Sequence, residues 1–295
     1  MADADSTQTA ERVPSPAAQP VQVVAVTSGK GGVGKTNVAA NIAVAVARQR
    51  RDVLLLDADL GLANVDVLLG LTPRYHLGHV LTGDATLEDA VIYGPGGIRI
   101  VPAASGDESM LDLDAFQHAA VIRAFEQMSR QPDVMIVDTA AGISADVVQF
   151  LRASDQIIVV VCDEPASMTD AYAIVKVMST IHGVRRFQIV TNMTRSAAEG
   201  RTLFQKLTAV SDRYLDVVLH HLGNVPYDAK LRRAVQQQRA VVECEPDCWS
   251  ARAFRNIAER ICAWPSPGAD HGDGGLSFFL KNILPGEARP TEADA

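Results

Sequence analysis

Eight consecutive residues near the N-terminus have the types and spacing that suit phosphate binding: Gly29-Lys30-Gly31-Gly32-Val33-Gly34-Lys35-Thr36. They match G-x-x-x-x-G-K-[ST], and they lie between a strand-like apolar run and a helix-like stretch, as that motif requires. The glycines allow backbone N–H groups to point at phosphates, and the helix N-terminus favours negative charge. We therefore expect Lys35 to neutralise the β- and γ-phosphates of ATP or ADP, and the Thr36 hydroxyl to bind Mg²⁺.

Three aspartates follow apolar runs that read as strands. Asp57 and Asp59 come after residues 53–56, and Asp138 ends the run 134–138. The C-terminal ends of parallel strands face the ligand crevice of an α/β sheet, so these carboxylates are candidates for the same site. We expect Asp138 to hold Mg²⁺ through water, and Asp57 to support the metal or the adjoining loop. An ordinary exposed aspartate is the alternative for each.

The elements that position these residues alternate along the chain. Short apolar runs rich in β-branched residues predict strands that are covered on both faces. They lie at 21–27, 53–57, 98–101, 134–138, 157–162, 187–192 and 217–219. Stretches with helical spacing lie at 36–48, 112–130, 167–182, 196–213, 229–238 and 250–263. Ser167 and Asp170 form a capping-box pattern at the start of the third helix. This order predicts a doubly wound α/β fold, with a mostly parallel sheet of about seven strands.

Composition divides the chain further. Residues 1–20 are expected to be a disordered tail, 21–264 the ATPase domain, 265–275 a linker and 285–295 a second disordered tail. The net charge is −8, which excludes a global basic field for nucleic acid. Hydrophobic residues make up 47% of the chain. No apolar run is long enough to span a membrane, and the N-terminus does not read as a secretory signal.

The four cysteines give a weak metal pattern. Cys244 and Cys248 are three residues apart, but no second pair or histidine cluster completes a site. Cys162 lies in an apolar run, where a buried free thiol is the ordinary interpretation. We expect reduced cysteines in a cytoplasmic protein.

Residues 276–284 form an apolar patch beyond the domain. Five large side chains share one face of a helix at spacings of 3, 4, 7 and 8. They are Leu276, Phe279, Leu280, Ile283 and Leu284. The segment can bind a membrane as an amphipathic helix, fold back onto the domain, or bind a partner. We hypothesise that it folds back in the nucleotide-free monomer and binds the membrane reversibly in a dimer.

The phosphate loop, with its additional Lys30, resembles the deviant Walker A ATPases, the class that contains MinD and ParA. The resemblance implies that Lys30 reaches the nucleotide of the other subunit in a dimer, and that Asp59 orients the attacking water. It implies that residues 139–142 form the second nucleotide-sensing loop. It also implies that Asn192 hydrogen-bonds the adenine, beside Pro226 and Tyr227, although Asn192 can equally be a turn former.

Longer segments resemble the flagellar-number regulators of the FleN or FlhG family. These segments are 60–70, 102–106, 162–165 and 169–172. The resemblance implies an ATP-dependent homodimer with slow ATPase activity, which restrains a sigma-54-dependent flagellar activator of the FleQ type. It also implies a cytoplasmic protein with reversible, polar membrane contact, acting beside the GTPase FlhF. The N-terminal Asp-Gln-Ala motif that stimulates that GTPase in some members does not occur in residues 1–20.

Three other functions fit parts of the pattern. A ParA-type partitioning or positioning ATPase would act on DNA or membrane, but the acidic balance disfavours non-specific DNA binding. An iron–sulfur carrier on the same fold would need a bridging cysteine pair, which Cys244 and Cys248 match poorly. A scaffold that binds nucleotide without hydrolysis is disfavoured by the presence of Lys30, Lys35, Asp59 and Asp138 together.

Overall fold

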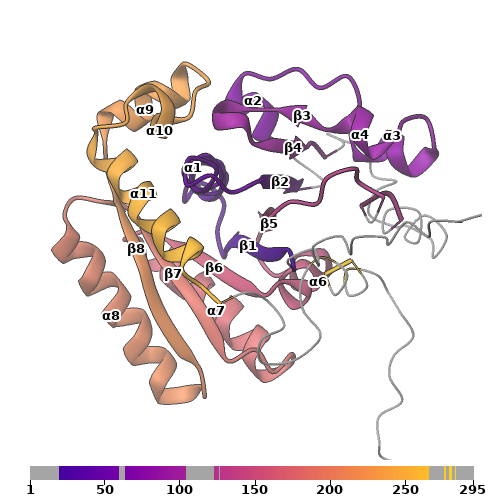
Figure 1. Ribbon diagram of the computed structural model, residues 1–295. Helices are drawn as coiled ribbons and strands as arrows, with labels where there is room; N and C mark the ends of the chain where they lie inside the picture. The colour runs from indigo at the N-terminus through magenta and orange to yellow at the C-terminus, as the bar shows by residue number, and fades with distance from the viewer. Residues whose placement is uncertain are drawn as a thin grey trace, which may run out of the picture.

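The computed structural model describes residues 20–59, 64–103, 123–125, 127–265, 276, 279, 280 and 283. Its centre is an eight-stranded sheet in the order β3-β4-β2-β5-β1-β6-β7-β8 (Figure 1). Every neighbouring pair is parallel except β3 with β4. The predicted doubly wound α/β fold is confirmed.

All seven predicted strands are present, with boundaries within three residues except at the end of β8, which runs seven residues beyond the predicted 217–219. The strands are β1 (Gln22–Ser28), β2 (Val53–Ala58), β3 (Ile92–Tyr93), β4 (Arg99–Val101), β5 (Val134–Ala141), β6 (Gln156–Val161), β7 (Arg186–Thr194) and β8 (Val218–Pro226). The eighth strand, β3, was not predicted, because two residues give no periodic pattern. It pairs antiparallel with β4 at the edge of the sheet.

The longer predicted helices are also present where the structure describes them. The helices are α1 (Lys35–Ala47), α2 (Val65–Leu69), α3 (Leu77–Thr82), α4 (Leu87–Ala90), α6 (Ala145–Ala153), α7 (Pro165–Thr180), α8 (Ala197–Tyr214), α9 (Ala229–Gln236), α10 (Val241–Cys244) and α11 (Trp249–Cys262), with a 3₁₀ turn η1 (Pro95–Gly97). The predicted helix at 112–130 lies largely outside the described residues. No helix in the described part of the chain combines the length and apolarity needed to cross a bilayer.

The capping box predicted at Ser167 is wrong. Helix α7 begins at Pro165, with Glu164 as its N-cap residue. Proline suits the first helical position because its fixed φ matches the helix and it has no N–H to satisfy. The Ser167 hydroxyl instead accepts a hydrogen bond from the Cys162 backbone N–H at 3.1 Å, and so ties the helix to the end of β6.

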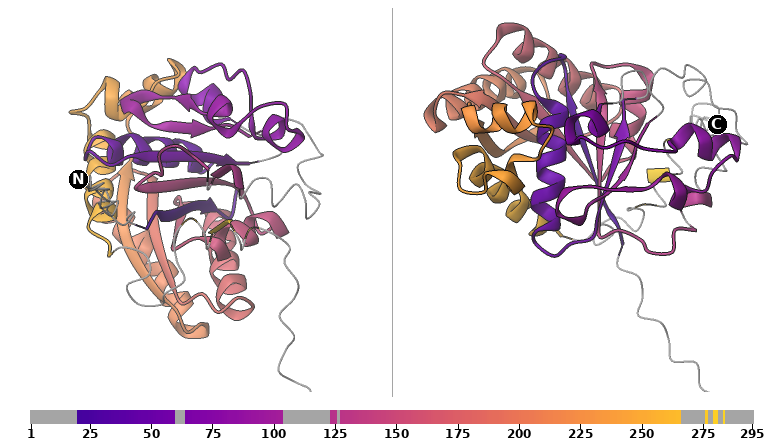
Figure 2. Two further views of the ribbon diagram at one scale, coloured as in Figure 1. Left: turned by 45° about the vertical axis from the view of Figure 1, so that its right-hand side comes forward. Right: turned by 90° about the horizontal axis from the view of Figure 1, so that it is seen from above.

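Alternate side chains of the central strands enter two hydrophobic layers. Val24 and Val26 of β1 pack with α1, α10 and α11 on one face. Val23 and Ala25 point to the other face, which is covered by α3, α4, α6, α7 and α8. Figures 1 and 2 show these helices on opposite sides of the sheet. Ten residues of α1 are buried, so the helix that follows the phosphate loop is held rigidly in the core.

The C-terminal apolar segment lies on the domain. Leu276, Phe279 and Leu280 are buried in the cluster that includes α3 and α4. The Phe279 ring is 6.2 Å from the ring of Phe150 on α6, in a stacked arrangement. Ile283 packs against the same cluster, and Leu284 lies outside the described residues. The described part of this segment is therefore docked on the domain.

Candidate functional site

The phosphate loop connects β1 to α1 and requires glycine for two reasons. Gly32 and Gly34 have φ of 84° and 85°, in the left-handed region that other residues rarely adopt. At Gly29 the limit is space, because a Cβ atom would lie 2.3 Å from the backbone carbonyl carbon of Asp170. At Gly34 it would lie 2.6 Å from Nδ2 of Asn192. The loop is therefore packed against both α7 and the end of β7.

Lys35 lies at the first position of α1 and points into the site. Its Nζ is 2.7 Å from Oδ1 of Asp138, at the C-terminal part of β5, and both side chains are buried. Burial raises the pKa of the Asp138 carboxyl, while the Lys35 ammonium acts in the opposite direction. The two residues predicted to serve the phosphates and the metal therefore hold each other in place.

The donors beside this pair fit a magnesium ion. Oδ2 of Asp138 is buried and has no hydrogen-bond partner among the described residues. The Thr36 hydroxyl is within 3.2 Å of Lys35 Nζ, and so belongs to the same group of side chains. A hydroxyl and a carboxylate beside a phosphate loop are the oxygen donors that Mg²⁺ uses with nucleotides. An unpaired, buried carboxylate oxygen is what such an ion, or its bound water, would satisfy.

Asp57 organises the loop that follows β2. Its oxygens accept hydrogen bonds from the backbone N–H groups of Asp59 (3.1 Å), Asn64 (3.0 Å) and Val65 (3.1 Å). Burial, and to a smaller extent the negative charge of Asp138, raises the pKa of Asp57 to about 7. Asp57 and Asp138 are paired in the register of β2 and β5, so the two carboxylates lie on neighbouring strands. This arrangement favours the loop-supporting role that was considered for Asp57, and it fixes the position of Asp59.

Lys30 has a different environment from Lys35. Its Nζ forms an ion pair with Oε2 of Glu164 at 2.6 Å, and the two side chains are 42% and 56% exposed. The hydrogen bond to Glu164 raises the pKa of Lys30, so the ammonium remains charged. Glu164 occupies the N-cap position of α7, where its side chain makes no capping hydrogen bond, and its contact holds Lys30 at the surface of the phosphate loop.

The end of β7 forms the other wall of the loop. The Asn192 side-chain amide is buried and donates a hydrogen bond from Nδ2 to the Val33 carbonyl at 2.8 Å. Met193 follows with a left-handed φ of 56°, at a register shift between β7 and β8. The Tyr227 N–H donates to the Thr194 carbonyl at 2.7 Å, which places the segment after β8 beside this wall. Contact of Asn192, Pro226 or Tyr227 with adenine remains a prediction.

Several residues that contact this site were not assigned to it from the sequence. Glu164 pairs with Lys30, the backbone of Asp170 closes on Gly29, and Met193 reaches Gly34. Glu164 and Asp170 lie in segments that resemble the flagellar regulators, so the resemblance pointed to these segments but not to the contacts that the two residues make. Their contacts depend on the approach of α7 to the phosphate loop, which no local sequence pattern reveals.

A family profile described as "ParA: NUBPL iron-transfer P-loop NTPase" matches residues 19–262. The chain belongs to the ParA family of P-loop NTPases. The match covers most of the chain and includes every catalytic and metal-binding residue predicted from the sequence.

Individual relatives refine this family assignment. The antiactivator FleN of Pseudomonas aeruginosa is 54% identical over 265 residues, which cover 90% of this chain and 94% of that protein. The flagellum site-determining protein YlxH of Helicobacter pylori is 31% identical, over 88% of this chain and 89% of that protein. Membership of the FleN and FlhG type, expected from the longer segments, is confirmed.

Solved structures agree with the fold. MinD of Pyrococcus horikoshii, solved as a complex with Mg-ADP, superimposes with a TM-score of 0.67 at 27% identity. The superposition covers 82% of this chain and 96% of that chain. The magnesium and ADP of that complex belong to that MinD, whose fold this chain shares.

The four cysteines lie outside the phosphate loop, in α10 and α11 or directly beside β6 and α11. Cys248 is buried, and its Sγ accepts a hydrogen bond from the Ala251 N–H at the start of α11. Cys244 ends the short helix α10, and all four cysteines are free thiols. Within the described ranges, no group of three or more histidine, cysteine or acidic residues can hold a metal ion.

Proposed function

We propose that the chain is an ATP-dependent dimerisation switch, whose slow hydrolysis of ATP returns it to the monomer. The observation that carries this proposal is the position of Lys30. Its ammonium lies at the exposed surface of the phosphate loop and is paired with Glu164, whereas Lys35 is buried among the metal-site residues. An exposed cation at this position is available to a nucleotide in a second subunit.

The nucleotide chemistry is assigned to a small set of residues. Lys35 neutralises phosphate charge, and Thr36 and Asp138 hold Mg²⁺, which screens the charge of the phosphates when bound. Asp59 orients the attacking water, and Asp57 fixes Asp59 through the backbone hydrogen bond at 3.1 Å. Phosphoryl transfer depends mainly on positioning and charge stabilisation, so a site that is completed only in the dimer hydrolyses slowly.

Formation of the dimer requires Lys30 to leave Glu164. Exposed ion pairs contribute little to stability because water and salt screen them, so the contact is readily exchanged. A nucleotide triphosphate offers Lys30 a higher negative charge than one carboxylate does. Lys30 therefore exchanges Glu164 for the ATP of the other subunit when the dimer forms. With ADP bound, Lys30 stays paired with Glu164.

The C-terminal segment provides a second output. In the monomer its apolar face is covered by the domain, as the burial of Phe279 and Leu280 supports. We propose that the ATP dimer releases the segment to the inner face of the membrane. Isolated helices of fewer than about 12 residues are marginal. Two C-terminal segments in one dimer therefore hold the protein on the membrane, whereas a single segment would detach from it.

The cellular role we propose is control of flagellar number. The support is the likeness to a protein named antiactivator FleN and to a protein named flagellum site-determining YlxH. The partner is a sigma-54-dependent flagellar activator of the FleQ type, which the dimer restrains. The protein acts in the cytoplasm and at the membrane of the cell pole, beside the GTPase FlhF.

The oligomeric state tests the switch. Multi-angle light scattering of the wild type is expected to give a monomer in ADP and a dimer in ATP with Mg²⁺. Asp59→Ala is expected to prolong the dimer, because one positioned group typically contributes about 10²-fold or more to the rate. Lys30→Ala is expected to remain monomeric in ATP while it still binds nucleotide. A wild-type chain that stays monomeric in saturating ATP would overturn the proposal.

A further inference from the structure

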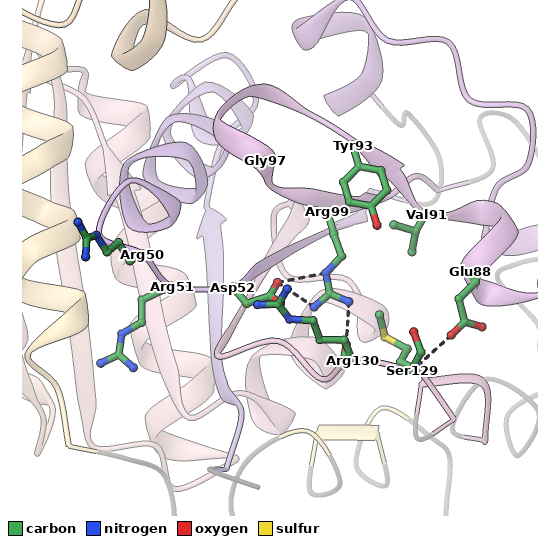
Figure 3. Close-up of a pocket in the computed structure, with 11 residues that line it drawn as sticks. Arg50, Arg51, Asp52, Glu88, Val91, Tyr93, Gly97, Arg99, Ser129 and Arg130 are labelled. Atoms are coloured by element: carbon green, nitrogen blue, oxygen red, sulfur yellow. Dashed lines mark hydrogen bonds and ion pairs between the residues drawn. The ribbon is translucent and has the colours of Figure 1, made fainter.

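A cavity of about 550 Å³ lies at the opposite end of the strands from the phosphate loop. Its walls come from the beginnings of β2, β4 and β5, together with α4 and β3 (Figure 3). This volume is within the range of about 300–1,000 Å³ that small-molecule sites occupy. None of the residues predicted to bind nucleotide lines it.

The cavity is positively charged on an acidic protein. Its lining contains four arginines against two carboxylates, Asp52 and Glu88. The chain as a whole carries a net charge of −8. In Figure 3, Arg50 and Arg51 extend away on one side, whereas Arg99 and Arg130 meet at Asp52 beside Tyr93. A local field of this sign attracts anions.

Arg99 is the buried member of the group, with 8% of its surface exposed. Its Nε and Nη2 donate to Oδ1 of Asp52 at 3.1 and 2.9 Å, and its Nη1 donates to the Arg130 carbonyl at 2.7 Å. A guanidinium has five N–H groups. One N–H on each Nη therefore has no acceptor among the described residues. These two N–H groups are available to an acceptor in the cavity.

Arg130 and Tyr93 complete the wall. Nε of Arg130 pairs with Oδ2 of Asp52 at 2.6 Å, on a side chain that is 78% exposed. Tyr93 is 74% exposed, and Figure 3 shows its hydroxyl directed toward Arg99. Glu88 is occupied by the backbone N–H of Ser129 at 2.9 Å. One carboxylate, Asp52, thus holds two guanidinium groups that retain free donors.

We propose that this cavity binds a small molecule carrying a phosphate group, with the phosphate held by Arg99 and Arg130 and the rest of the molecule against Tyr93. Guanidinium groups bind phosphate oxygens through paired N–H groups, and Arg99 and Arg130 together carry one positive charge more than Asp52 neutralises. An aromatic face beside the anion site suits a ring-bearing or sugar-bearing ligand. The site is independent of the phosphate loop and of the switch proposed above.

Titration calorimetry on the full chain tests the site. The phosphate loop is first filled with one equivalent of ADP and Mg²⁺ and unbound ADP is removed, so that added phosphate cannot bind there and the cavity stays free of ADP. Inorganic phosphate and pyrophosphate are the first probes. A sugar phosphate and a nucleoside monophosphate then show which organic group the cavity prefers. Arg99 is left intact, because removing it would leave Asp52 buried without its main partner.

The informative variants are Arg130→Ala and its matched control Arg213→Ala, an exposed arginine on α8. Loss of the Arg130 guanidinium is expected to weaken pyrophosphate binding at least about tenfold, as loss of a charge-assisted contact does. Arg213→Ala is expected to bind as the wild type does, and both variants are expected to bind ADP normally. Absence of saturable binding in the wild type, or equal binding in Arg130→Ala, would overturn the proposal.

Discussion

The two lysines of the phosphate loop differ in what surrounds them. Lys35 is 7% exposed and pairs with a fully buried aspartate, so it cannot move without leaving a charge unpaired in the core. Lys30 pairs with a half-exposed glutamate at the surface. The same residue type therefore forms a fixed part of the phosphate site at one position and an exchangeable contact at the other.

Glycine substitutions separate packing from nucleotide binding in this loop. Gly29→Ala is expected to lower the stability of the nucleotide-free protein by about 1–3 kcal/mol, as overpacking does. The cause is the backbone of Asp170, which lies 2.3 Å from the new methyl group. Gly31→Ala is the matched control in the same loop, because its Cβ meets nothing within 4 Å. Thermal unfolding without nucleotide measures the stability of both variants. Equal unfolding midpoints for Gly29→Ala and Gly31→Ala would contradict the close packing of Gly29 against Asp170.

The sequence predicts the residues of the site more completely than their contacts. The phosphate loop and the strand-end aspartates follow from local patterns, and the structure brings Lys35 and Asp138 together as expected. The pairing of Lys30 with Glu164 joins residues 134 positions apart in the chain. It depends on how α7 crosses the loop, and that depends on tertiary packing rather than on local propensity.

At the scale of elements, the long strands and helices were predictable because each has a strong period or apolar run. Most of the elements that were missed are short: β3 has two residues, and α4 and α10 have four each. Helix α6, with nine residues, was missed as well. The short elements are stabilised by their neighbours, since a single helical turn does not form alone. Helix α4, for example, packs Leu87 and Ala90 into the cluster that holds the C-terminal segment.

The docking of the C-terminal segment can be loosened from the domain side. Phe150→Ala removes the ring that stacks on Phe279 without altering the segment itself. An aromatic pair contributes about 0.5–1.5 kcal/mol beyond its buried area, so docking should weaken roughly tenfold. Sedimentation with anionic liposomes in ADP is expected to show more bound protein for this variant than for the wild type.

Two variants control that experiment. Phe204→Ala removes a partly buried ring on α8, far from the segment, and is expected to behave as the wild type does. Phe279→Ala removes an apolar contact from the segment and is expected to reduce liposome binding in ATP. Unchanged sedimentation of Phe150→Ala in ADP would mean that docking does not compete with the membrane.

At the scale of the whole molecule, charge opposes self-association. Each chain carries a net charge of −8, so two chains repel each other over distances beyond the contact surface. Salt screens this repulsion, with a Debye length of about 10 Å at 0.1 M. The specific contacts of Lys30 act at short range, where screening has less effect.

The ATP dimer is therefore expected to become tighter with added salt. Sedimentation velocity at about 20 and 200 mM salt should show the dissociation constant falling by at least about threefold. Asp59→Ala is the form to use, because its dimer should persist during the measurement. A dimer that weakens with salt would instead indicate that opposite charges dominate the interface.

The irregular pairing of β7 with β8 also affects the outer edge of the sheet. The register shifts twice between these strands, and the second shift places Asn192 and Met193 beside the phosphate loop. Strand β8 is a nine-residue edge strand, and a long, regular edge invites pairing with another chain. A strand that is bent by bulges is a poor template for such pairing. The distortion that packs Asn192 and Met193 against the phosphate loop thus also protects the protein from aggregation through its exposed edge.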